Sequence, residues 1–143
     1  MSLRRPRVIV VEDDPDVLLF LRLNLESAGY DTSLAADGST AMRRIEHERP
    51  DLVILDLMLP LMDGWAVLGE LHDRPDAPKV IVCSAQGGSS ERARARGLGV
   101  VDFVVKPFDI RDLLASVQRA LAPQGEAGRL LLPELGLPGI EPA

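Results

Sequence analysis

The sequence predicts an α/β fold, a doubly wound five-stranded parallel sheet with helices on both faces. Short runs of apolar, largely β-branched residues alternate along the chain with longer stretches whose apolar residues recur at helical spacing. The first, third and fourth of the short runs are apolar almost throughout, which is typical of parallel strands that are buried on both faces. Because five such strands alternate with helices, we expect one sheet between two layers of helices.

The strands are expected, in chain order, at 7–11, 30–36, 52–56, 79–84 and 100–105. The helices are expected at 15–29, 38–50, 63–73, 89–97 and 108–122. The first helix has a clear start, because Asp14 suits an N-cap and Pro15 suits the first helical position. Gly29 and Pro50 are typical of the residues at which helices end.

The segment 86–99 predicts the weakest of these helices. It contains two adjacent glycines and three arginines, and it has few large apolar residues. Such a helix buries little area and is marginally stable. Two interpretations remain open, a short exposed helix or a segment that becomes ordered on activation or on partner binding.

Length and composition indicate one compact domain. The chain has 143 residues, of which 46 % are hydrophobic and 27 % are charged, as is usual for a globular protein. We expect this domain at 6–121. The segment 122–143 is rich in Pro and Gly and predicts a linker or a poorly ordered tail.

Charge and cysteine content exclude several classes of protein. A net charge of −6 argues against direct binding of nucleic acid, which requires a basic face. Cys83 is the only cysteine, so an internal disulfide cannot form and a reducing, cytoplasmic setting is expected. No stretch approaches the roughly 20 apolar residues of a membrane span, so we expect no membrane partner.

Polar residues follow four of the expected strands where each strand ends. Asp13, Asp56, Ser84 and Lys106 occupy these positions, and the carboxyl ends of parallel strands meet at the edge where ligands bind. Any one of them alone would be interpreted as a solvated acid, a capping hydroxyl or a surface lysine. Their convergence on one edge favours a site instead. A cis bond before Pro107 would turn the Lys106 side chain toward this edge.

The acids of this edge suit a divalent cation. Glu12, Asp13 and Asp14 are consecutive, and like charges this close repel unless they share a cation. With Asp14 assigned to the helix start, Glu12 and Asp13 face the edge beside Asp56. Hard oxygen ligands in small number suit Mg²⁺. A carboxylate nucleophile at Asp56, a metal, a lysine and a hydroxyl together predict a phosphoryl-transfer site.

Four motifs carry a resemblance to a known family. VVEDD, DLMLPLMDG, CSA and DFVVKPF occur in this order and at family spacing. From residue 6 to about residue 121 the sequence resembles the receiver domain of two-component response regulators, of the CheY-like superfamily. The resemblance implies a flavodoxin-like fold with strand order 2-1-3-4-5.

The resemblance also implies roles for the residues of the site. Asp56 would accept a phosphoryl group from a sensor histidine kinase or a phosphotransfer protein. Asp13, Asp56 and the backbone carbonyl of Met58 would bind Mg²⁺ directly, and Glu12 would act through water. Lys106 would contact the phosphoryl group.

Two further residues would couple phosphorylation to the surface. Ser84 would swing to bind a phosphoryl oxygen, and Phe103 would follow it inward as the aromatic switch, so that the surface for a downstream protein partner changes. Family members that bind DNA often carry an arginine in the last helix for a symmetric dimer. Ser116 stands at that position here, which makes a homodimer of that type less expected.

Two rival functions compete with this interpretation. A phosphatase with an aspartate nucleophile needs a second aspartate two residues later, where this chain has Met58. The chain is therefore not expected to be an enzyme beyond its own phosphoryl transfer and autodephosphorylation. The alternative is a receiver-like protein-interaction module that is never phosphorylated.

Overall fold

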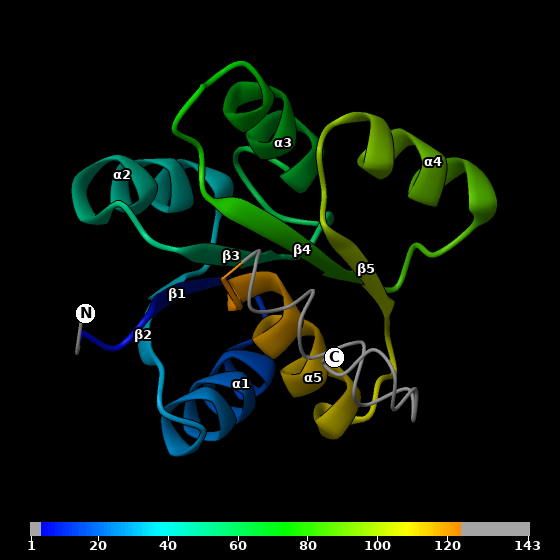
Figure 1. The fold of residues 1–143 in the computed structure, drawn as a ribbon. Coiled ribbons are helices and arrows are strands. Elements are labelled where there is room, and N and C mark those ends of the chain that lie inside the picture. Colours follow the sequence, from blue (N-terminus) through cyan, green and yellow to red (C-terminus); the bar gives the residue numbers. More distant parts are fainter. Residues whose placement is uncertain (1–3, 124–143) are drawn as a thin grey trace, which may run out of the picture.

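The computed structural model describes residues 4–123, in which strands and helices alternate (Figure 1). In chain order the elements are β1 (Arg7–Val11), α1 (Pro15–Ser27), β2 (Asp31–Ala35), α2 (Gly38–Glu48), β3 (Leu52–Leu55), α3 (Gly64–His72), β4 (Lys79–Ser84), α4 (Ser89–Gly97), β5 (Asp102–Val105) and α5 (Ile110–Leu121). The expected type and order of elements are confirmed. The largest differences are two residues: β5 and α5 begin two residues later than expected, and α1 and α2 end two residues earlier.

The five strands form one parallel sheet in the order β2-β1-β3-β4-β5, as the resemblance implied. The three central strands are buried almost throughout, whereas β2 and β5 at the two edges are mostly half-buried. The continuous apolar runs of β1, β3 and β4 therefore reflect their central positions.

Two layers of helices cover the sheet, with α1 and α5 on one face and α2, α3 and α4 on the other (Figure 1). Side chains alternate along each strand, so residues of the same strand enter different cores. Ile9, for example, packs toward α2 and α3, and its neighbour Val10 packs toward α1 and α5. Both side chains are fully buried.

Aspartates begin four of the five helices. The side chains of Asp14, Asp37, Asp63 and Asp109 each accept a hydrogen bond from a backbone N–H in the first turn, so the role expected of Asp14 is confirmed. The exception is α4, whose N-cap is Gly88 and which has no side-chain cap. This helix therefore starts without the stabilisation that the others share.

The expected tail falls almost wholly outside the part of the chain that the structure describes. Helix α5 ends at Leu121, and the segment 124–143 lies beyond the described residues. Within 4–123, none of the helices has both the length and the hydropathy that a membrane span requires.

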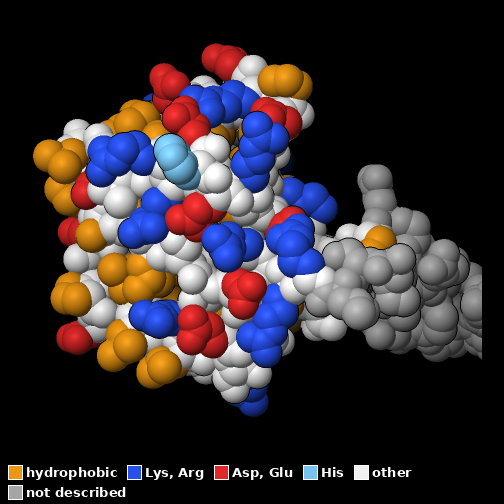
Figure 2. Space-filling model, turned by 90° about the vertical axis from the view of Figure 1, so that its left-hand side faces the viewer, with side chains coloured by type: hydrophobic (Ala, Val, Ile, Leu, Met, Phe, Trp, Pro, Cys, Tyr) orange, Lys and Arg blue, Asp and Glu red, His pale blue; other side chains and the backbone are white. Residues whose placement is uncertain are grey.

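Basic and acidic side chains are interspersed on the side of the molecule that carries α2 and the start of β1 (Figure 2). Ion pairs account for part of this pattern, including Arg4 with Asp51 and Arg7 with Glu48. This face therefore does not present a broad basic surface of the kind that a nucleic-acid backbone requires.

Gly64, at the start of α3, lies very close to the backbone of the residues that follow β3. A Cβ added at Gly64 would lie 2.4 Å from the backbone oxygen of Asp56 and 2.5 Å from Cα of Leu57. We expect Gly64→Ala to lower the free energy of unfolding by about 1–3 kcal/mol, because the backbone must shift to relieve the overlap. Urea denaturation would measure the change.

Gly69, in the same helix, provides the matched control. No heavy atom lies within 4 Å of a Cβ added there, so Gly69→Ala should raise the free energy of unfolding by about 0.5–1 kcal/mol. Equal effects of the two substitutions would contradict the packing described for Gly64.

Candidate functional site

Backbone hydrogen bonds hold the carboxyl ends of neighbouring strands together beyond the strands themselves. The N–H of Glu12 donates to the carbonyl of Ala35 at 3.0 Å, and the N–H of Asp56 donates to the carbonyl of Val11 at 3.0 Å. Between β4 and β5, the N–H of Lys106 donates to the carbonyl of Ser84 at 2.9 Å. The residues that follow β1, β3 and β5 are thereby fixed at one edge.

Lys106 joins the ends of three strands at this edge. Its Nζ donates to Glu12 Oε1 in a short contact and to Asp56 Oδ2 at 3.0 Å. Glu12 and Asp56 are both buried, with 4 % and 7 % of their surface exposed. Buried carboxylates are stable only when they are paired or hydrogen-bonded, and Lys106 supplies that pairing.

The shared ammonium does not fully compensate the acids. Burial raises the pKa of the Glu12 carboxyl above its usual value, and hydrogen bonds from Lys106 and from the Asp14 N–H lower it by less. The Asp56 charge adds to the increase. Burial acts to lower the pKa of Lys106, but its hydrogen bonds to Glu12 and Asp56 outweigh burial and raise it. The site therefore favours an additional positive charge.

The Asp56 carboxylate has a fixed orientation. Its Oδ1 accepts a hydrogen bond from the N–H of Met58 at 3.1 Å, while Oδ2 accepts from Lys106. The loop after Asp56 is held in turn, because the N–H of Gly64 donates to the carbonyl of Leu57 at 3.0 Å. Both oxygens of the carboxylate are thus positioned by donors from different segments.

Three carboxylates form a group that could hold a metal ion. Glu12, Asp13 and Asp56 each offer an oxygen, and these oxygens lie within 4.8 Å of one another. Asp13 is exposed and the other two are buried, so the group opens to solvent on one side. An acidic set of hard oxygen ligands with room for water suits Mg²⁺. Within 4–123 this is the only group of three such ligands that could hold a metal.

Ser84 and Phe103 lie near the same edge but do not contact Asp56. Ser84 is fully buried, and its Oγ accepts a hydrogen bond from the N–H of Gln86 at 3.2 Å. Phe103 is half-buried in β5, and the guanidinium of Arg92 lies 5.3 Å from the centre of its ring. The sequence did not single out Arg92, because nothing in the spacing of α4 indicates which aromatic ring an arginine will meet.

The structure also shows the state of the Lys106–Pro107 bond and of Cys83. The Lys106–Pro107 peptide bond is cis. Cys83 is buried beside the site, and burial raises the pKa of its thiol to about 12. A thiol in this state is a small apolar side chain and is neither a nucleophile nor a metal ligand at neutral pH.

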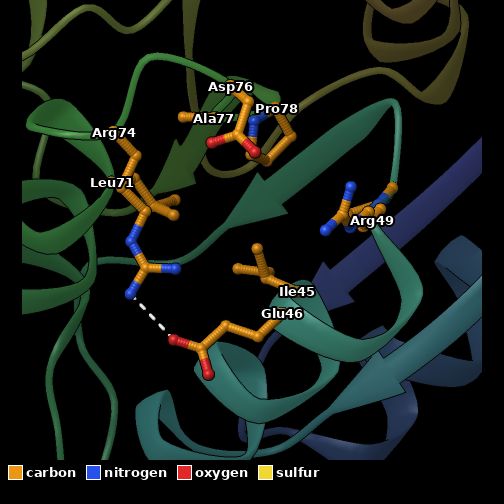
Figure 3. Close-up of a pocket in the computed structure, with 9 residues that line it drawn as sticks. Ile45, Glu46, Arg49, Leu71, Arg74, Asp76, Ala77 and Pro78 are labelled. Atoms are coloured by element: carbon orange, nitrogen blue, oxygen red, sulfur yellow. Dashed lines mark hydrogen bonds and ion pairs between the residues drawn. The ribbon is translucent and has the colours of Figure 1, made fainter.

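A pocket of about 370 Å³ lies at the opposite edge of the sheet (Figure 3). It is formed where α2 leads into β3 and where the segment after α3 leads into β4. Across it, Arg74 donates to Glu46 at 2.8 Å, and Arg49 and Asp76 add a further pair of opposite charges to the lining. Its charges are balanced, and it shares no residue with the acidic group at the carboxyl edge.

The comparisons with known proteins agree on one family. The family model of the response regulator receiver domain matches residues 8–118. The chain is 40 % identical over 121 residues to the transcriptional activator protein IrlR of Burkholderia pseudomallei, covering 85 % of this chain and 52 % of that protein. It is 41 % identical over 126 residues to the transcriptional regulatory protein KdpE of Mycobacterium tuberculosis, covering 88 % and 55 %. The chain thus spans about half the length of these curated relatives.

Solved structures show the same fold. The receiver domain of the Francisella response regulator 1452 matches with a TM-score of 0.78 and 30 % identity, over 81 % of this chain and 96 % of that one. The non-phosphorylated HemR receiver domain of Leptospira biflexa matches with a TM-score of 0.78 and 30 % identity, over 84 % and 97 %.

The acidic group predicts that Mg²⁺ stabilises the folded protein. A cation that binds only the folded state should raise the free energy of unfolding by about 2.7 kcal/mol at a hundredfold excess over its Kd. Asp13→Asn should remove most of this gain. Thermal unfolding with MgCl₂, compared with NaCl at equal ionic strength, would measure both effects.

Asp112 offers the control, because it is also an exposed acid and lies outside the group. Asp112→Asn should keep the full Mg²⁺ effect. If Mg²⁺ raised the stability of the native chain and of Asp13→Asn equally, the acidic group would not be the binding site.

Proposed function

The chain belongs to the response regulator receiver domain family, and from this premise we propose that it is a signalling switch activated by phosphorylation of Asp56. One observation carries the proposal. Asp56 is a buried carboxylate that is oriented by Lys106 and by the Met58 N–H, and it lies within 4.8 Å of two further acids. A reactive carboxylate beside a lysine and a potential cation site is what transfer of a phosphoryl group to a carboxylate requires.

In the proposed reaction, a carboxylate oxygen of Asp56 attacks the phosphorus of a phosphohistidine. A P–O bond forms to Asp56, and the P–N bond to the histidine breaks. The leaving imidazole keeps the electron pair of that bond and takes a proton from solvent. Lys106 already lies 3.0 Å from Asp56 Oδ2, so its ammonium is close enough to move onto a phosphoryl oxygen as negative charge accumulates there.

Asp13, Asp56 and the backbone carbonyl of Met58 would hold Mg²⁺, with Glu12 acting through water. When bound, the ion would neutralise charge on the phosphoryl oxygens. The grouping of the three carboxylates supports this assignment, and burial, with a smaller contribution from the Asp56 charge, raises the pKa of Glu12 in spite of its bond to Lys106.

Ser84 and Phe103 would connect the phosphoryl group to the surface. To bind a phosphoryl oxygen, the Ser84 hydroxyl would swing toward Asp56, and its present bond from the N–H of Gln86 would stretch or break. Phe103 would then move inward from its present half-buried position in β5. Such a change of two side chains would alter the surface formed by α4 and β5 and with it the binding of a downstream protein.

The upstream partner would be a sensor histidine kinase or a phosphotransfer protein, and the setting would be the cytoplasm. The relatives IrlR and KdpE are named as transcriptional proteins, and this chain covers about half of each. We propose that residues 6–121 act as the receiver, and that any output comes from a protein partner or an attached segment. The residues of this domain would not bind nucleic acid directly.

The function predicts a single covalent adduct. Incubation with a small phosphodonor and Mg²⁺ should add one phosphoryl group, read as intact mass, and omission of Mg²⁺ should greatly reduce the yield. Asp56→Asn should abolish the adduct, because the amide is a far weaker nucleophile than the carboxylate.

Asp51→Asn is the matched control, since Asp51 lies at the other end of the same buried strand, just before β3, and pairs with Arg4 at the opposite edge of the sheet. It should be phosphorylated like the native chain. A native chain that bound Mg²⁺ but formed no adduct would favour the alternative, a protein-interaction module that is not phosphorylated.

A further inference from the structure

Helix α4 is held to the domain by unusually few apolar contacts. Ala95 is the only residue of this helix that is buried, and the N-cap Gly88 provides no side-chain hydrogen bond. The helix lies beside α3 and over β5 (Figure 1). Something other than a buried apolar face must therefore fix its position.

Arginines of α4 provide that attachment. The guanidinium of Arg94 lies 4.0 Å from the centre of the Trp65 ring, in α3, and that of Arg92 lies 5.3 Å from the centre of the Phe103 ring, in β5. Both distances are within the range of cation–π attraction. Arg94 therefore attaches α4 to α3, and Arg92 attaches it to Phe103, the aromatic residue of the proposed switch.

Arg92 makes a second contact that Arg94 does not. Its Nε donates to the carbonyl of Gly87 at 3.1 Å, in the loop between β4 and α4. In the same loop, the N–H of Gln86 donates to the hydroxyl of Ser84. Arg92 thus contacts Phe103 directly and contacts the loop that holds the Ser84 hydroxyl.

The Phe103 side chain packs against the core on one side and borders a hollow on the side of Arg92. A hollow of about 120 Å³ lies between α4 and β5, and Arg92, Val100 and Phe103 are among the residues that line it. The ring is therefore not enclosed by tight packing on this side. The guanidinium of Arg92 over the ring supplies an attraction that inward movement of the ring would weaken.

We propose that Arg92 is a positioning residue that couples the two switch side chains, because one guanidinium holds Phe103 in its present position and the Ser84 loop in its present conformation. If this is so, Arg92 restrains activation, and that consequence rests on the proposed function. Movement of either Phe103 or the loop weakens the contact to the other, so the two should move together.

The first test needs no phosphorylation. In the full chain, Arg92→Ala should speed amide exchange at Gln86 and Gly87 and shift the ring signals of Phe103 in NMR spectra. Arg96→Ala, which removes the same charge from the same helix but contacts neither Gly87 nor the ring in the structure described, should leave exchange at Gln86 and Gly87 unchanged. Because Arg96 also lines the hollow beside Phe103, this control is read at the loop and not at the ring. Arg92→Lys should be intermediate, because a single ammonium keeps the charge but cannot stack flat on the ring and donate from a fixed fork.

The second test separates coupling from a general loosening of α4. In a double-mutant cycle with Phe103→Leu, Arg92→Ala should have little further effect on exchange at Gln86 if it acts with the aromatic ring. Additive effects would overturn the proposal. Arg94→Ala should speed exchange within α4 but leave Gln86 and the Phe103 ring unchanged.

The third test is the rate of phosphorylation by a small phosphodonor. Loss of an exposed cation–π contact should raise the population of the switched state, and with it the rate, by roughly two- to fivefold in Arg92→Ala. If the native chain forms an adduct but Arg92→Ala changes neither the rate nor the exchange, the inference fails and the proposed function stands. If no adduct forms in either protein, the proposed function fails, and the NMR cycle still decides whether Arg92 couples the two side chains.

Discussion

Two buried carboxylates and one ammonium share the carboxyl edge of the sheet, and the rest of the site depends on how they compensate one another. Glu12, Asp56 and Lys106 follow three different strands, and Lys106 is 94 residues from Glu12 in sequence. Their side chains meet only because the sheet is parallel and its strands end together. The fold therefore places two negative charges, on Glu12 and Asp56, and only one positive charge, on Lys106, in a poorly hydrated site.

That imbalance gives the edge its chemistry. A third acid, Asp13, adds negative charge on the open side, so a divalent cation and Lys106 together would match the three carboxylates more closely than Lys106 alone. Transfer of a phosphoryl group to Asp56 would increase the negative charge again and would draw Lys106 away from Glu12. In the proposed switch, the free energy that drives the rearrangement thus comes from electrostatics within a few ångströms of Asp56, and weakly held elements such as α4 are those that can respond to it.

The fold was predictable from sequence because its signals are local. Apolar strands, the N-cap Asp14 and residues such as Gly29 and Pro50 act within a few residues, and such local signals placed every element to within about two residues at each end. Strand ends then predicted which polar residues share an edge. The direct contact of Glu12 with Lys106, the hydrogen bond from Gln86 to Ser84 and the cation–π contact of Arg92 with Phe103 were not predicted. Each of these contacts depends on which rotamer a side chain adopts and on which of several neighbours it meets once the segments have packed together. The spacing of residues in the sequence does not determine either.

Asp102 illustrates how such side-chain choices bear on assembly. Its Oδ2 accepts a hydrogen bond from the buried hydroxyl of Ser116 and lies 3.5 Å from Arg119, and its Oδ1 accepts from the N–H of Phe103. Both oxygens are therefore engaged within the domain, beside the residue assigned to the aromatic switch. A symmetric interface over β5 and α5 that pulled Asp102 away from Ser116 would leave a buried hydroxyl without this partner. By the resemblance, Ser116 stands where DNA-binding family members often carry an arginine, and here it engages an acid of β5. On that alignment a charge-paired homodimer on this face would lack its cation, and a dimer there would rely on apolar contacts such as the exposed Val101.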